Sequence, residues 1–223
     1  MERKNIKFGF YSLFYSVVVE DMKYPFSHYE TVNEFFTREV KPRNITEDPN
    51  SLVSPADSKI ISIQKIDEDQ IIAVKGVNYS LGQFLYGKEN QLTQNDIQNL
   101  KKNTSNDLYS IVFYLAPGDY HRYHSHDNMN IDSITHIPGY LFNVKDTKLT
   151  PTTYTENERI IVNGSSDMGN FYYGIVGATN VGSMQLSFDS EYETNLVEQD
   201  HKVIYLNNSY IILLQENMKN QEL

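Results

Sequence analysis

The sequence contains no cysteine and no tryptophan. Without cysteine the chain forms no disulfide, no thiolate metal site and no cysteine nucleophile. Basic residues are also scarce, since 19 Lys and Arg stand against 29 Asp and Glu and the formal net charge is −10. Because proteins bind nucleic acid mainly through Lys and Arg, this balance argues against a nucleic-acid partner. It argues equally against simple electrostatic attachment to an anionic membrane.

Long hydrophobic runs are missing as well, so we expect no transmembrane helix. The most apolar N-terminal stretch, residues 6–19, is interrupted by polar residues and lacks the small-residue cleavage site of a signal peptide. Its aromatic side chains suit a helix packed on the core or a helix lying in the membrane interface. Contact of the N-terminal region with a membrane surface therefore stays open.

What the sequence does contain is enough apolar residues for a folded core: 39% of the 223 residues are hydrophobic and 13% are aromatic. Helical patterns come first, with capping-box sequences that begin at Ser27 and Thr31. Short strand patterns separated by Gly, Asn or Asp follow. We predict an α+β fold in a single domain, 1–223, with a helical region over 1–45 and a mostly antiparallel, β-rich core over 51–215.

The individual elements follow from hydrophobic periodicity and turn residues. We predict short helices after Ser80 (81–86) and after Thr93 (to about Lys102), with a polar surface excursion over 91–107. Strands are predicted at 59–66, 71–74, 108–115, 131–137, 158–162, 170–178, 181–188, 202–206 and 210–214. The first two of these strands are expected to form a hairpin.

The chemistry is concentrated in the loop after strand 108–115, which Pro117-Gly118 opens. Within ten residues this loop carries two carboxylates, one arginine and three of the six histidines. General acid–base chemistry is the leading interpretation, because a histidine beside a carboxylate exchanges protons near neutral pH. Two alternatives stay open: a metal cluster of His121, His124 and His126, and histidines that are only hydrogen-bonded in a polar loop.

Several short motifs occur in an order that resembles the phosphatidylserine decarboxylase family, the pyruvoyl-dependent enzymes that make phosphatidylethanolamine. The most specific is Leu115-Ala-Pro-Gly-Asp-Tyr-His-Arg-Tyr-His124. The others are Glu34-Phe-Phe-Thr-Arg38 with Val40-Lys-Pro42, Ser54-Pro-Ala-Asp57, Val74–Leu81, Ile137–Leu141, Asn157-Glu-Arg159 and Val176–Ser183. Each motif alone is weak, but the ordered set covers nearly the whole chain.

The resemblance implies a reaction in two stages. In the first stage the chain cuts itself before a serine, and that serine becomes a covalent pyruvoyl group. Asp57 and His124 match the carboxylate and the histidine that activate this serine. In the second stage the pyruvoyl group binds the amine of phosphatidylserine and withdraws electrons while carbon dioxide leaves. His121 matches the histidine of this second stage, and no metal is implied.

The cleavage motif departs from the family pattern, which is Gly-Ser-Thr after a glycine-rich lead-in. The counterpart here is Asn208-Ser209-Tyr210. Ser209 is then the nucleophile and the pyruvoyl precursor, and cleavage falls between Asn208 and Ser209. Asparagine tolerates positive φ and so can replace glycine at a bend. Ser183, which also follows a glycine, is a weaker competitor.

Two functions of different classes follow from these motifs. The first is a membrane-peripheral phosphatidylserine decarboxylase with a phospholipid substrate, at an intracellular membrane. The sequence does not distinguish a mitochondrial from an endomembrane location, and it allows a homodimer. The second is a decarboxylase-like protein that never matures and binds phospholipid or a partner without catalysis. The state of the Asn208–Ser209 bond discriminates between them.

Overall fold

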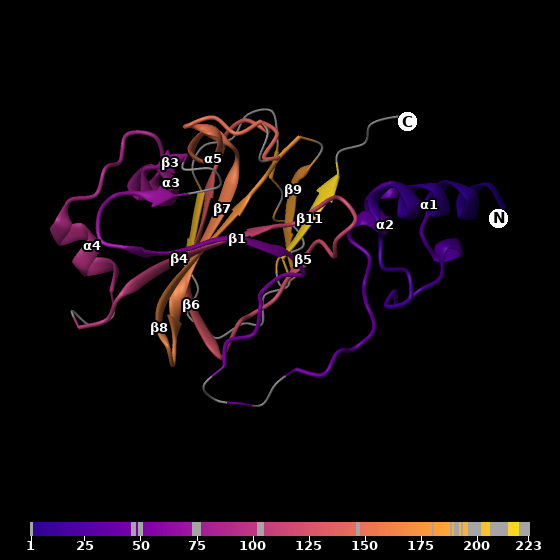
Figure 1. Cartoon of the computed structure of the whole chain (residues 1–223), viewed down its shortest axis with the longest axis horizontal. Helices are drawn as coiled ribbons and strands as arrows, with labels where there is room; N and C mark the ends of the chain where they lie inside the picture. The colour runs from indigo at the N-terminus through magenta and orange to yellow at the C-terminus, as the bar shows by residue number, and fades with distance from the viewer. Residues whose placement is uncertain are drawn as a thin grey trace.

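The computed structural model describes residues 2–45, 48, 51–72, 77–101, 105–145, 148–179, 181–187, 189, 192, 194–195, 202–205 and 214–218 (Figure 1). Helices come first and strands dominate afterwards, which confirms the α+β prediction. The elements are α1 (Glu2–Tyr15), η1 (Phe26–His28), α2 (Val32–Phe36), β1 (Lys59–Ile66), β2 (Ile71–Ile72), β3 (Asn78–Tyr79), α3 (Leu81–Tyr86), α4 (Gln94–Leu100), β4 (Leu108–Tyr114), β5 (Arg122–Tyr123), β6 (Met129–Ile137), α5 (Thr153–Glu156), β7 (Arg159–Ser166), β8 (Gly169–Val176), β9 (Val181–Leu186), β10 (Lys202–Tyr205) and β11 (Leu214–Met218).

The centre of the molecule is a four-stranded antiparallel sheet in the order β10-β6-β7-β8. Strand β7 is buried on both faces, and its side chains alternate between two cores. Ile160 and Val162 pack with residues of β9, whereas Ile161 packs with α3 and α4. The sheet is therefore the middle layer between a helical layer and a second sheet of order β5-β11-β9.

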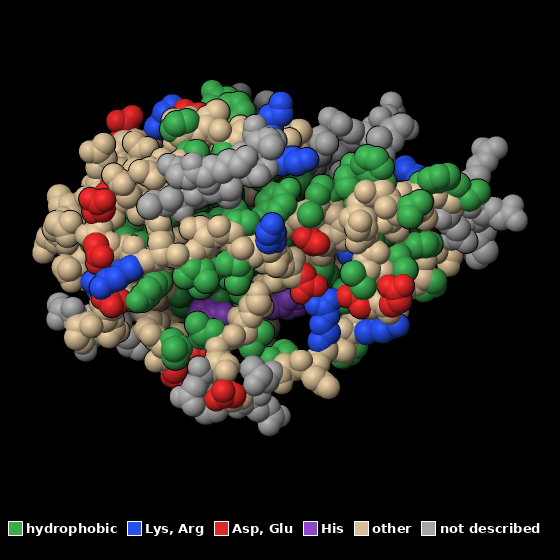
Figure 2. Space-filling model, in the orientation of Figure 1, with side chains coloured by type: hydrophobic (Ala, Val, Ile, Leu, Met, Phe, Trp, Pro, Cys, Tyr) green, Lys and Arg blue, Asp and Glu red, His purple; other side chains and the backbone are tan. Residues whose placement is uncertain are grey.

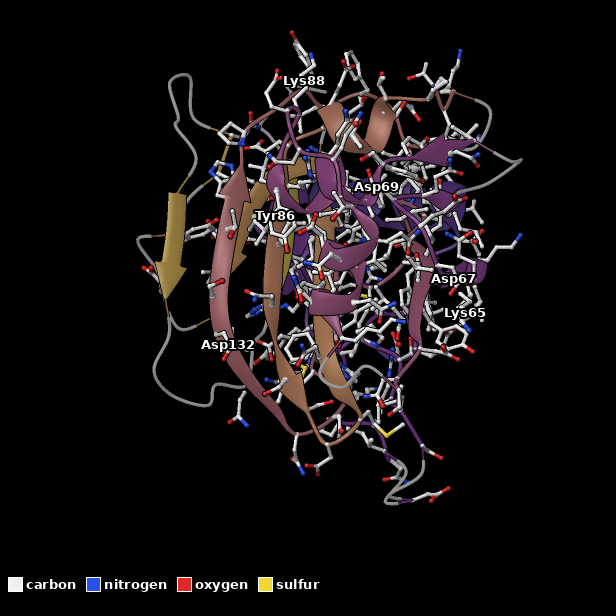
Figure 3. All side chains as sticks on the ribbon, turned by 90° about the vertical axis from the view of Figure 1, so that its left-hand side faces the viewer. Lys65, Asp67, Asp69, Tyr86, Lys88 and Asp132 are labelled. Atoms are coloured by element: carbon white, nitrogen blue, oxygen red, sulfur yellow. The ribbon has the colours of Figure 1, made fainter. Side chains whose placement is uncertain are left out.

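Helices α3 and α4 cover one face of the central sheet, as Figure 3 shows from the side of Tyr86. Ser80 and Thr93 cap them as predicted, and Thr93 forms a complete capping box with Asp96. Ile97 and Leu100 of α4 are buried in the core. The described part of the excursion over 91–107 lies largely at the surface, as predicted, but one face of α4 is apolar and packs on the sheet.

The predicted hairpin of strands 59–66 and 71–74 is also wrong. Strand β1 pairs along its length with β4, while β2 pairs with β3. The reason is the longer ladder that β4 offers, since hydrogen bonds and cross-strand side-chain pairs accumulate along it. Of the last predicted strand, 210–214, only Leu214 lies in the described residues, where it begins β11.

The helical region 1–45 is broken into three short elements with their own small core. Phe8, Met22, Tyr29 and Phe35 are buried there. Helix α1 ends where Ser16 takes a positive φ of 57° and the Val17 N–H donates to the Ser12 carbonyl at 2.9 Å, the pattern of a Schellman cap. No helix among the described residues is long and apolar enough to cross a membrane.

Candidate active site

The histidine loop runs from the end of β4 into β5 and is closed by its own hydrogen bonds. The Asp119 N–H donates to the Ala116 carbonyl at 2.9 Å, and the Ala116 N–H donates to Asp119 Oδ2 at 2.7 Å. Pro117 and Gly118 lie inside this turn, as the sequence predicts for a strand that stops here. The turn directs His121 into the protein.

His121 is almost completely buried, with 3% of its surface exposed. Its Nδ1 lies 3.0 Å from the Asp119 carbonyl oxygen, which can only accept a hydrogen bond, so Nδ1 carries the proton. The ring packs on Phe36 of α2, with the ring centroids 3.9 Å apart. Burial lowers the pKa of His121 to about 4, so the imidazole is neutral at pH 7 and Nε2 holds a free lone pair.

The N-terminal region holds this loop from outside. Buried Arg38 donates from Nη2 to the Gly118 carbonyl at 2.8 Å and from Nη1 to the Asp119 carbonyl at 3.3 Å. The Tyr11 hydroxyl of α1 donates to the Pro117 carbonyl at 2.9 Å. Arg38 belongs to a motif quoted above, but the sequence did not reveal this contact with the loop.

His124 lies beside the turn that carries Asp57, because the His124 N–H donates to the Pro55 carbonyl at 2.8 Å. The two predicted partners do not hydrogen-bond to each other in the described part of the chain. Both carboxylate oxygens of Asp57 instead accept from Arg43 Nη1, at 2.6 and 2.7 Å. His124 Nε2 lies 2.9 Å from the Tyr120 hydroxyl.

Electrostatics nevertheless connects Asp57 with His124. Burial is the largest cause that lowers the pKa of His124, and the Arg122 and Arg43 cations add to it. The Asp57 carboxylate acts in the opposite direction and raises the pKa of His124. The turn and the loop are thus close enough for the carboxylate to act on the imidazole.

His126 takes a third direction, with Nδ1 against the Tyr173 hydroxyl of β8 and its ring edge-on to Phe171. His121, His124 and His126 therefore contact three different partners. Within the described ranges, no group of three or more His, Asp or Glu side chains is placed to hold a metal ion. Figure 2 shows histidine atoms at the surface near the centre of this face, with hydrophobic side chains around them.

Asn208, Ser209 and Tyr210 lie outside the described residues. The described chain stops at Tyr205, which pairs with Ser133, and resumes at Leu214, which pairs with Tyr123. The start of β11 thus lies opposite the residue that precedes His124. The competitor Ser183 lies within β9 and pairs with Asn217 of β11, next to a shift in the register of the two strands.

The Asn157-Glu158-Arg159 motif joins several segments of the fold by buried hydrogen bonds. The Arg159 guanidinium, 1% exposed, donates to the carbonyls of Gln83, Phe84, Thr155 and Asn157. Burial lowers the pKa of Arg159 to about 10. Glu158 contacts His136 Nε2 at 2.8 Å inside the protein. The sequence showed this motif but not its partners.

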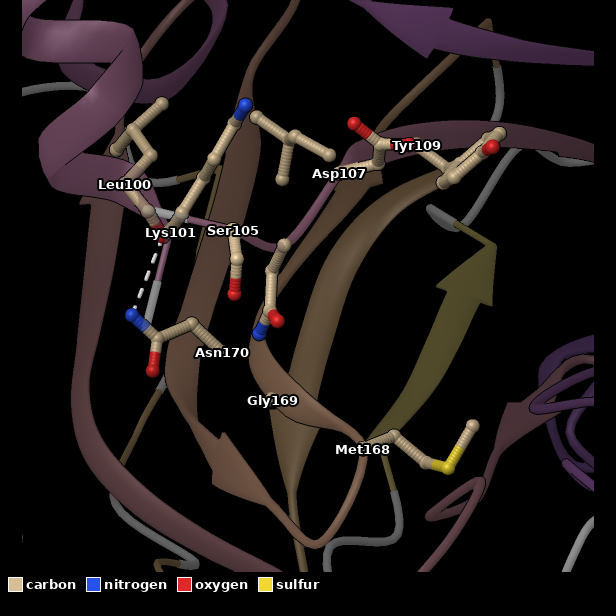
Figure 4. A pocket seen from close by; sticks show the side chains of 10 residues that line it. Leu100, Lys101, Ser105, Asp107, Tyr109, Met168, Gly169 and Asn170 are labelled. Carbon is tan, nitrogen blue, oxygen red and sulfur yellow. Dashed lines mark hydrogen bonds between the residues drawn. The ribbon is translucent and has the colours of Figure 1, made fainter. Parts of the chain in front are cut away.

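A separate cavity of about 350 Å³ lies at the other end of β4 (Figure 4). It is lined by the end of α4 and by the turn between β7 and β8, where the Asn170 side-chain amide donates to the Leu100 carbonyl at 3.1 Å. None of the predicted site residues lines this cavity. The histidine loop is therefore the candidate active site.

An α+β protein with a buried neutral histidine and a carboxylate turn beside a second histidine is suited to proton-transfer catalysis. Residues 32–222 match the family model described as phosphatidylserine decarboxylase. The chain therefore belongs to the phosphatidylserine decarboxylase family.

Relatives from animals and bacteria agree with this match. The "Phosphatidylserine decarboxylase proenzyme, mitochondrial" of Caenorhabditis elegans is 34% identical over 194 residues, which cover 86% of this chain and 49% of that protein. The Rattus norvegicus protein of the same name is 34% identical over 197 residues, with 79% and 46% covered. The "Phosphatidylserine decarboxylase proenzyme" of Escherichia coli (strain 55989 / EAEC) is 37% identical over 177 residues, with 77% and 52% covered. The chain spans about half the length of the curated relatives it matches.

Proposed function

We propose that this protein decarboxylates phosphatidylserine to phosphatidylethanolamine through a pyruvoyl group that it makes from Ser209. The observation that carries the proposal is the family match over residues 32–222, within which the histidine loop and the Asp57 turn lie side by side. The word proenzyme in the names of the relatives supports maturation by cleavage.

In the self-cleavage we propose, Ser209 Oγ attacks the carbonyl carbon of Asn208 and the peptide C–N bond breaks, which leaves an ester. Elimination then breaks the Cβ–O bond of Ser209, releases the Asn208 carboxylate and leaves an N-terminal dehydroalanine. One water hydrolyses this group to ammonia and the pyruvoyl end. His124 would take the serine proton, and Asp57 would stabilise the imidazolium that forms. The pairing of Leu214 with Tyr123 supports this assignment, since it brings the chain that follows Ser209 to the histidine loop.

In the decarboxylation we propose, His121 is the proton-handling residue. The pyruvoyl group supplies the electron sink for the loss of carbon dioxide. The Nε2 lone pair of His121 is available at neutral pH, because Nδ1 is committed to the Asp119 carbonyl and burial keeps the ring uncharged. Phe36 on the face of the ring limits access of water to it.

We also propose that α1 contacts the membrane that contains the substrate. Four of its side chains are strongly exposed although they are apolar: Ile6, Phe10, Leu13 and Phe14, 57–81% exposed. They recur at helical spacing, as expected for a helix lying in the interface. With a net charge of −10, apolar insertion and not charge attraction would drive the contact. An intracellular membrane location and a homodimer stay predictions.

The state of the Asn208–Ser209 bond tests the proposal. We expect the intact mass of the denatured protein to show two pieces, one of them residues 209–223 with a pyruvoyl end. The Ser209→Ala chain should stay whole, and Ser183→Ala should be cut like the parent. The His121→Gln chain should be cut but should release no carbon dioxide from phosphatidylserine. A folded parent chain that is never cut would instead favour a non-maturing phospholipid-binding protein.

A further inference from the structure

Arg43 connects the groups that surround His124. Its Nη1 donates to both carboxylate oxygens of Asp57, at 2.6 and 2.7 Å, and its Nη2 donates to Asp21. Its guanidinium carbon lies 5.8 Å from the centroid of the Tyr120 ring, within range of a cation–π contact. The Tyr120 ring in turn stacks on the His124 ring, with the centroids 5.5 Å apart.

We propose that Arg43 is a positioning residue for self-cleavage, which holds the Asp57 carboxylate beside His124 and holds Tyr120 against the His124 ring. The inference rests on the self-cleavage proposed above. Arg43 directly follows one of the motifs of the resemblance, and those motifs give it no role.

The guanidinium group suits this task because it is planar. One edge can bind carboxylates while the face lies on an aromatic ring, which a lysine ammonium cannot do with the same geometry. Asp21 supplies Arg43 with a second anion. Arg43 therefore keeps a partner when Asp57 turns towards the imidazolium of His124 during proton transfer.

The positive charge of Arg43 also favours the neutral form of His124, which is the form that can accept a proton. The charged and titratable groups that face this imidazole are Asp57, Arg43, Arg122 of β5 and Tyr120 of the same loop. Arg43 and Arg122 add to the burial that lowers the pKa of His124, and Asp57 opposes them. Only a neutral imidazole can accept the serine proton, so Arg43 extends its action towards lower pH.

A histidine NMR titration tests the inference without any need for cleavage. In the uncut Ser209→Ala chain, we expect Arg43→Gln to raise the pKa of His124, because a nearby cation that disfavours the imidazolium is lost. His124→Gln identifies the signal, and Arg43→Lys, which keeps the charge, should shift it less. Lys23→Gln is the matched control, since Lys23 is also 42% exposed and pairs with Glu39 instead. An Arg43→Gln titration curve that coincides with the parent curve would overturn the proposal.

Cleavage kinetics give the second measurement, with Ser209 in place. With Arg43→Gln, the fall of the cleavage rate in acid should move to higher pH. The size of this move should equal the change in the pKa of His124 seen in the titration. The rate at higher pH should fall about tenfold, part of what positioned acid–base catalysis contributes. Unchanged cleavage at every pH would contradict the role of Arg43. Failure of the parent chain to cleave would contradict the proposed function and with it the role of Arg43 in cleavage, while the titration still decides whether Arg43 acts on His124.

Discussion

At the scale of single residues, His121 and His124 differ in how far they are withdrawn from water. His121 is enclosed by Phe36 and its own loop, whereas His124 is half-buried and lies near two arginines and a carboxylate. The desolvation of His121 is therefore the stronger, and its neutral form is fixed over the whole physiological range. His124 stays open to adjustment by its neighbours, which suits a residue that takes up a proton and returns it.

Burial of His121 predicts a loss of stability in acid. The folded imidazole titrates near pH 4, whereas the unfolded one titrates near its ordinary value of 6.5. Below pH 6.5 the unfolded chain binds the proton first, so the free energy of unfolding falls until about pH 4 and then levels off. The total is about 3 kcal/mol. Urea unfolding of Ser209→Ala at pH 7 and pH 4 should show this loss, and the same chain with His121→Gln should lack it. Equal losses in both chains would refute the assignment.

The motifs name the site residues but not their hydrogen-bond partners, and the roles of Asp57, His121, His124 and Ser209 stay predictions. The turn that carries Asp57 lies next to His124, whose N–H donates to the Pro55 carbonyl. Arg43 escaped prediction because its contact with Asp57 joins two irregular segments, where no periodicity relates one position to another. The hydrogen-bond acceptors of buried Arg159 were unpredictable for a similar reason, since all of those found are backbone carbonyls.

At the scale of elements, α1 and the histidine loop form one packed unit. A Cβ atom added to Gly118 would lie 1.9 Å from the Tyr15 carbonyl oxygen at the end of α1. The absence of a side chain at position 118 therefore lets the helix end reach the loop. The same contact places Tyr11 within hydrogen-bond distance of Pro117.

Gly118→Ala should separate this helix end from the loop. We expect it to destabilise the protein by about 1–3 kcal/mol, the usual cost of inserting a methyl group into a filled space. Amide hydrogen exchange in α1 should quicken at the same time. Gly9→Ala is the matched control in the same helix, because a Cβ there meets nothing within 4 Å. It should stabilise the helix by about 0.5–1 kcal/mol. Similar behaviour of the two variants would contradict the contact.

The positions of the long strands were predicted well, and the pairing between strands was predicted less well. Strand β7 extends beyond the predicted 158–162 because Gly164 lets the backbone of β6 approach. A Cβ at Gly164 would lie 2.0 Å from the Asn130 carbonyl oxygen. A polar Gly-Ser-Ser sequence reads as a turn when its neighbours in space are unknown. The prediction of a β1–β2 hairpin was wrong for a similar reason. The short separation in sequence favoured β2 as the partner of β1, whereas β1 pairs with β4.

At the scale of the whole molecule, the exposed apolar side chains are unevenly distributed. Figure 2 shows hydrophobic side chains gathered at the end of the molecule where α1 lies in Figure 1. The buried side of the same helix carries Phe8 and Tyr11, which face the N-terminal core. Helix α1 thus packs one apolar face against the interior and exposes a second apolar face. The exposed face is suited to contact with a lipid surface.

Replacing Phe10 and Leu13 by serine should weaken binding to phosphatidylcholine vesicles. If both side chains enter the interface, the double variant should lose about 2 kcal/mol of binding free energy, roughly thirtyfold in affinity. Vesicle sedimentation at low and high salt measures this loss, and salt should change it little because the contact is apolar. Met168→Ser, at another exposed apolar site between β7 and β8, should bind like the parent. Loss of binding in high salt alone would point to charge attraction instead.

Strand β11 has neighbours on both sides, β5 and β9, and this position changes what cleavage would do to the molecule. The cut proposed before Ser209 leaves β11 on the small piece. That piece would remain in place as the inner strand of its sheet. Global unfolding would then release a second molecule, so the midpoint of thermal unfolding would depend on protein concentration after maturation and not before it.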